Sequence, residues 1–109
     1  MGKNIDLIVD EFIEAIKDSS AYQEYVEQQQ RVKDQPDVIA KIDEIRSLNL
    51  RMSSIQNSEQ AYDELENLDR RFDELSEDQR VFDFIEAENK FIGLYQDIYK
   101  KIMEQIQII

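Results

Sequence analysis

The chain has 109 residues and a formal net charge of −12, with 35% charged and 41% apolar residues. It contains no cysteine and no histidine, which excludes disulfides, thiolate metal sites and hydrolases built on a Ser-His or Cys-His pair. The large negative charge repels phosphate backbones and anionic lipid surfaces, so we expect neither direct nucleic-acid binding nor membrane binding.

Glycine and proline are scarce, at two residues and one residue. Few tight turns can be built from them, so the helices or strands must be long and their connections few. The apolar residues recur every three or four positions almost throughout, which is the period of a helix. We therefore predict a single all-α domain over residues 1–109, an antiparallel helical bundle of about four to five helices with a long C-terminal helix.

The first apolar stripe predicts a helix from about Asn4 to Asp18. Ser19 and Ser20 interrupt this stripe. Ser20 is followed three residues later by Gln23, which fits a capping box and predicts that a second helix starts at Ser20. The alternative is one continuous helix that bends at this point.

Pro36 is the clearest break in the chain and predicts the first turn of a third helix, because proline fits there and not inside a helix. This helix runs to about Gln56. Asn57 and Ser58 predict a turn, with Ser58 as the cap of a fourth helix. That helix carries a heptad seam of apolar residues spaced 4, 3, 4 and 3 apart, namely Ala61, Leu65, Leu68, Phe72 and Leu75.

Residues Ser76 to Gln79 fit a second capping box and predict the start of the last helix. Its apolar residues nearly encircle it between Phe82 and Ile109. About 30 helical residues span roughly 45 Å, which is longer than a globule of this size is wide. A helix that is apolar on most sides must be covered on most sides, so we expect a homodimer that packs these helices together.

Acidic residues gather between positions 57 and 88, which hold twelve acids and three bases. This stretch either attracts a basic partner or simply forms a solvated helix face. Paired carboxylates at helical spacing resemble those of all-helical nucleoside triphosphate pyrophosphatases, which hold Mg²⁺ against a phosphate. With 25 acids in the chain such pairs also arise by chance, so we assign no catalytic residue, metal or cofactor. The pairs are Glu11 with Glu14, Glu24 with Glu27, and Glu66 with Asp69.

Three segments together resemble a known family. Residues 16–25 carry the pattern Ile-x-x-Ser-x-x-Tyr-x-x-Tyr, residues 32–37 place Val32 before Asp-Gln-Pro-Asp, and residues 81–88 read Val-Phe-Asp-Phe-Ile-Glu-Ala-Glu. This combination resembles the YlbF/YmcA family of helical regulatory proteins and extends from about Ile8 to Ile106. Some members hold iron–sulfur clusters through cysteines, which this chain lacks, so we expect no such cofactor.

The resemblance implies a cytoplasmic regulatory adaptor, not an enzyme, in Gram-positive bacteria. Family members influence competence, sporulation and biofilm formation, partly by guiding the processing of messenger RNA by an endoribonuclease. We therefore expect a regulatory protein partner, with Tyr22, Tyr25, Val81, Phe84 and Phe91 as candidate contacts. The alternatives are a Mg²⁺-dependent nucleoside triphosphate pyrophosphatase and a purely structural helical oligomer.

Overall fold

The computed structural model of the chain describes residues 3–55 and 59–106. Within these two ranges the chain forms five helices and no strand, which confirms the predicted all-α fold with a long last helix. The predicted cap at Ser58 lies outside the described residues. The helices are α1 (Ile5–Asp18), α2 (Ser20–Val32), α3 (Pro36–Ser54), α4 (Glu59–Ser76) and α5 (Gln79–Ile106).

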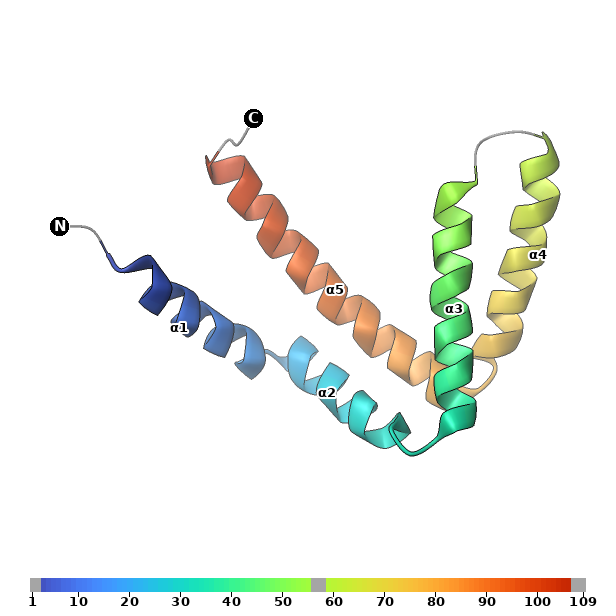
Figure 1. Ribbon diagram of the computed structural model, residues 1–109, viewed down its shortest axis with the longest axis horizontal. Helices are drawn as coiled ribbons and strands as arrows, with labels where there is room; N and C mark the ends of the chain where they lie inside the picture. The colour runs from blue at the N-terminus through green and yellow to red at the C-terminus, as the bar shows by residue number, and fades with distance from the viewer. Residues whose placement is uncertain (1–2, 56–58, 107–109) are drawn as a thin grey trace.

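The five helices form two arms that meet at one vertex (Figure 1). In the hairpin arm, α3 and α4 lie side by side and antiparallel. In the long arm, α1 and α2 follow one another and run antiparallel to α5. The molecule is flat and elongated, with extents of 59 × 39 × 16 Å. Each of the 28 residues of α5 adds about 1.5 Å along the helix axis. This single helix therefore extends from the vertex to the far end of the long arm (Figure 1).

The hydrophobic core begins at the vertex, where α5 starts, and continues between α3 and α4 as far as Leu48 and Leu68. Val38 and Ile45 of α3 and Val81 of α5 are the largest side chains with almost no exposed surface. Burying one large aliphatic side chain stabilises a fold by about 1.5–3 kcal/mol, so this cluster holds the two arms together. The other buried members of the cluster are Val32, Ile42, Leu48, Leu68, Leu75, Phe84 and Ile85.

The predicted heptad seam of α4 is confirmed. Ala61, Leu68 and Leu75 are buried, and Leu65 and Phe72 are half-buried. Spacings of three and four place these side chains on one face of the helix, and α4 packs against α3 and α5. The same face therefore supplies the contribution of α4 to the core.

Charged side chains connect the beginnings of α3 and α5. The Arg80 guanidinium lies 3.1 Å from the Asp37 carboxylate and 2.7 Å from the Asp78 carboxylate. Lys41 Nζ lies 3.0 Å from Asp78 Oδ2, the same oxygen that Arg80 contacts. Hydrogen bonds from Arg80 and Lys41 hold the pKa of Asp78 well below its usual range. The network thus ties the two helix starts together beside the core.

The break between α1 and α2 is sharp, and its cap is Ser19. Ser19 has extended backbone angles (φ −66°, ψ 147°), and its Oγ accepts a hydrogen bond from the Tyr22 amide at 3.2 Å. The prediction that the second helix starts at Ser20 is confirmed, but its capping residue is Ser19, because Ser20 is already helical. Gln23 reaches back as a capping-box residue does, but its Nε2 donates to the Lys17 carbonyl at 3.0 Å.

The start of α5 corrects the second predicted capping box. Ser76 is the last residue of α4, and Asp78 occupies the position before α5. Asp78 Oδ1 accepts a hydrogen bond from the Arg80 amide at 3.1 Å, and the Asp78 carbonyl accepts from the Val81 and Phe82 amides. The Asp78 side chain thus accepts from an amide of the first turn, as a capping serine does. The prediction for Pro36, by contrast, is confirmed, since it is the first residue of α3.

Candidate functional site

Four of the five candidate contact residues come together where α2 lies along α5. The Tyr25 ring stacks on Phe91, with ring centroids 5.4 Å apart and 18° between the planes. Tyr22 meets Phe91 edge-on at 5.5 Å, and Phe84 meets Tyr25 at 5.8 Å and 59°. Residues 22 and 25 share one face of α2, and residues 84 and 91 lie two turns apart on α5. We call these four residues the aromatic cluster.

Within this set the depth of burial differs. Phe84 is 4% exposed and Val81 is 0% exposed, so both belong to the vertex core. Val81 does not join the aromatic cluster. Tyr22, Tyr25 and Phe91 are half-buried and reach the surface. A partner that binds the folded chain therefore has access to these three rings and not to Val81 or Phe84.

Arg46 of α3 packs against Phe84, the buried member of the aromatic cluster. The Arg46 guanidinium lies 5.6 Å from the centre of the Phe84 ring, within the range of a cation–π interaction. It also donates to Glu88 of α5 at 2.7 Å. This hydrogen bond raises the pKa of Arg46. The contact joins the hairpin arm to the long arm.

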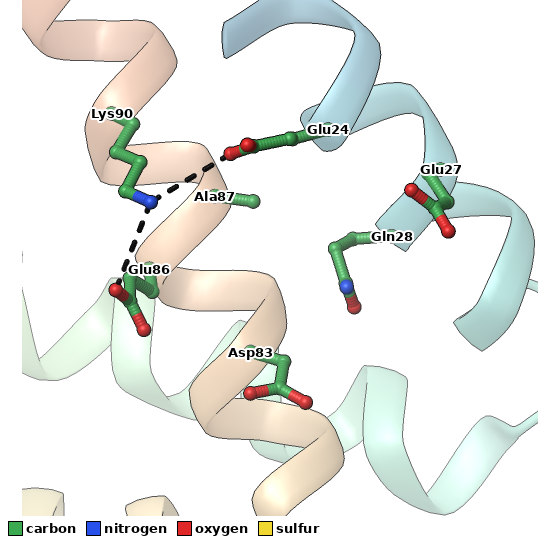
Figure 2. A pocket seen from close by; sticks show the side chains of 7 residues that line it. All are labelled: Glu24, Glu27, Gln28, Asp83, Glu86, Ala87 and Lys90. Carbon is green, nitrogen blue, oxygen red and sulfur yellow. Dashed lines mark ion pairs between the residues drawn. The ribbon is translucent and has the colours of Figure 1, made fainter. Parts of the chain in front are cut away.

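A hollow of about 260 Å³ lies beside the aromatic cluster, between α2 and α5 (Figure 2). Four carboxylates line it, two from each helix. Lys90 is the cation of its lining, and its Nζ lies 3.7 Å from Glu24 and 3.9 Å from Glu86. The hollow is therefore negative. Its lining residues are Glu24, Glu27, Gln28, Asp83, Glu86, Ala87 and Lys90.

Glu24 and Glu27 are one of the acidic pairs predicted from the sequence, whereas their counterparts on α5 were not predicted. Asp83 and Glu86 have the same spacing of three, and Figure 2 shows all four side chains around the hollow. The sequence shows this spacing. It does not show that α2 and α5 lie side by side along this part of the two helices.

The predicted acidic pairs do not combine into a metal site. Among the residues that the structure describes, no group of three or more carboxylates is placed to hold a metal ion. Glu11 and Glu14 lie on α1, whereas Glu66 and Asp69 lie on α4 in the other arm. Glu66 instead lies 3.6 Å from Arg70 one turn further along its helix. The pyrophosphatase alternative thus gains no support from the arrangement of these pairs.

Comparison with known proteins identifies the family. A family described as control of competence regulator ComK, YlbF/YmcA, matches residues 5–107. The chain belongs to the YlbF/YmcA family. No curated protein and no solved structure matches the chain.

The YlbF/YmcA match includes every described helix from its first residue to its last. It confirms the resemblance that the tyrosine pattern of α2 and the start of α5 indicated. Membership places the chain in a regulatory family that controls competence. In the described part of this YlbF/YmcA chain, no helix is both long enough and apolar enough to cross a membrane.

Proposed function

We propose that the chain is a cytoplasmic, non-catalytic adaptor that regulates competence by binding another protein. The observation that carries this proposal is the family match over residues 5–107. The side-chain inventory agrees with it, because a chain without cysteine and histidine lacks a thiol nucleophile and the commonest general base. Regulation by binding needs neither of them.

The acidic hollow and the rings beside it are the surface that we propose for the partner. Four carboxylates against one lysine favour a basic segment. The half-buried edges of Tyr22, Tyr25 and Phe91 add apolar contact next to this charge. A tyrosine at such an edge offers a large apolar face together with a hydroxyl group. The proposed partner segment therefore carries lysine or arginine together with apolar side chains.

The resemblance to the family extends the proposal to a process. We propose that the regulated step includes the processing of messenger RNA by an endoribonuclease, and through it sporulation and biofilm formation. The expected result is a changed set of transcript ends in a host strain that lacks the chain. Mapping of RNA ends in the native host measures it, and unchanged ends would remove this part of the proposal.

Affinity capture with surface variants tests the adaptor proposal. Glu27→Lys together with Glu86→Lys reverses two charges of the hollow, and the ion pairs that they lose are exposed and weak. We expect this variant to lose a partner that the wild-type chain recovers from a native lysate, while circular dichroism stays unchanged.

Glu66→Lys together with Asp69→Lys is the matched control, because it makes the same change in charge on α4. The control variant should recover the partner as the wild-type chain does. If both variants lose it equally, the binding depends on overall charge and the hollow is not the contact. If the wild-type chain recovers no specific partner, the adaptor proposal fails.

A further inference from the structure

A second hollow lies at the vertex, between the last turn of α4 and the first turns of α5, and has a volume of about 280 Å³. Three apolar side chains line it. Ile85 is 8% exposed and Phe72 is half-buried, whereas the Phe82 ring is 46% exposed. We call this hollow the phenylalanine pocket. Almost half of one of its rings is therefore left in contact with water.

The size of the phenylalanine pocket suits one side chain of a partner. Pockets for small molecules and cofactors have volumes of about 300–1,000 Å³, and this pocket lies just below that range. Protein interfaces bury their strongest anchor side chains in apolar pockets of this kind. A large apolar side chain that enters it removes water from the exposed part of the Phe82 ring, which favours binding.

The polar part of the phenylalanine pocket is acidic. Asp73 of α4 and Glu86 of α5 contribute carboxylates, and Ser76 and Asn89 complete the lining. No lysine or arginine belongs to the lining that the structure describes. The Glu86 carboxylate lies 3.9 Å from Lys90, in an exposed and weak ion pair. The pocket therefore favours an apolar side chain in a basic segment over one in an acidic segment.

Glu86 connects the phenylalanine pocket with the acidic hollow, because it lines both. In Figure 2 its side chain points away from Glu27 and Gln28 of α2. The pocket is lined by residues 82, 85, 86 and 89 of α5, and the hollow by residues 83, 86, 87 and 90. The two sets differ by one position, which is a rotation of about 100° around the helix and a rise of about 1.5 Å along it. The two sites therefore lie on adjacent sides of the same turns of α5.

We propose that one segment of the protein partner crosses α5 and occupies both sites, with a lysine or arginine in the acidic hollow and a large apolar side chain in the phenylalanine pocket. Around a helix about 10–12 Å wide, a rotation of about 100° is a path of roughly 10 Å. An extended chain advances about 3.3–3.6 Å per residue, so about three residues separate the basic side chain from the apolar one. This inference rests on the proposed function and adds the apolar anchor and its spacing.

Selection from a library of random peptides displayed on phage tests the spacing. Peptides that bind the immobilised wild-type chain should share a lysine or arginine and, about three residues away, a leucine, isoleucine, methionine or phenylalanine. Selection on Phe82→Ala should keep the basic residue and lose the apolar one. Selection on Glu24→Lys with Glu27→Lys should do the reverse. Peptides without a common spacing, or no enrichment by the wild-type chain, overturn the proposal.

Fluorescence anisotropy with a labelled copy of the selected peptide measures what the phenylalanine pocket contributes. Phe82→Ala should raise the dissociation constant at least about tenfold. Asn89→Phe covers the pocket with a new ring and removes none of its apolar side chains, and it should have the same effect. Tyr62→Ala is the matched control, because Tyr62 is 71% exposed near the start of α4, far from the vertex. Circular dichroism of all four chains should coincide, and unchanged peptide binding by Phe82→Ala overturns the proposal.

Capture from a native lysate separates this inference from the proposed function. The partner that the wild-type chain recovers should be lost by Phe82→Ala and by Asn89→Phe, and kept by Tyr62→Ala. If Glu27→Lys with Glu86→Lys loses the partner but both pocket variants keep it, the hollow is the contact, and only the inference about the pocket is wrong. If the wild-type chain recovers no specific partner, the proposed function fails and this inference fails with it.

Discussion

The ring of Tyr25 stacks on the ring of Phe91 with centroids 5.4 Å apart. This pair is a contact that fastens α2 to α5 beyond the vertex. Tyr22 closes the cluster on the outer side, edge-on against Phe91. Past this point the long arm opens, and α1 has no contact with α5 within 8 Å between Cα atoms of the described residues. The aromatic cluster therefore marks where the internal packing of the long arm ends.

Phe91→Ala should lower the free energy of unfolding by about 1–3 kcal/mol, because a half-buried ring with two aromatic neighbours is lost. Urea unfolding followed by circular dichroism measures this change. Phe82→Ala is the control, since Phe82 is 46% exposed on the same helix. We expect less than about 1 kcal/mol there. Equal effects of both substitutions would show that the stack does not hold the arm.

Phe84→Ala should cost more, about 3–5 kcal/mol, because this ring is buried in the vertex core and its removal leaves a cavity. Any loss of partner binding in this variant should then follow the unfolded fraction. Tyr22→Phe removes one hydroxyl and no ring, and should leave stability within about 0.5 kcal/mol. A Phe84→Ala chain that unfolds like the wild-type chain but no longer binds its partner would contradict the core assignment.

Ser19→Ala should destabilise the fold by about 1 kcal/mol, because the Tyr22 amide loses its hydrogen-bond acceptor at the start of α2. Ser20→Ala should change stability by less than about 0.5 kcal/mol, since alanine is the better helix former inside the first turn. Thermal unfolding of the two variants side by side measures the difference. If Ser20→Ala destabilised the fold more than Ser19→Ala, the capping residue would be Ser20 and not Ser19.

The Asp78 carboxylate should contribute a part of the dependence of stability on pH. Its pKa is lowered mainly by the hydrogen bond from Arg80 and further by Lys41. A carboxyl group with a lower pKa in the folded chain stabilises the fold fully above its unfolded value of about 3.9. That contribution is lost as the pH falls through this value toward the folded one.

Asp78→Asn should therefore lower the free energy of unfolding at pH 7 and flatten its decline between about pH 5 and pH 2. Urea unfolding at a series of pH values provides the measurement. Asp63→Asn on the exposed side of α4 is the control and should follow the wild-type curve. If Asp78→Asn and the wild-type chain lose stability in parallel, the network around Arg80 does not contribute to acid unfolding.

The sequence alone determined the local structure of this protein. Pro36 marked the start of α3, the seam from Ala61 to Leu75 predicted the buried face of α4, and the scarcity of glycine indicated long helices. These signals are local, because a helix repeats every 3.6 residues and its ends are decided by a few neighbours. Where two candidates for a cap stood close together, as at Ser19 and Ser20, the pattern misplaced the cap by one residue.

The tertiary structure decided which of these faces meet. The periodicity of α5 did not distinguish Val81 and Phe84, which are buried in the core, from Phe91, which reaches the surface. Nor did it place Asp83 beside Glu24 and Glu27, which lie 56 or more residues earlier in the chain. Contacts between distant segments depend on how side chains of several helices fill one space. For the same reason, only the folded chain showed that no residue of α1 is buried.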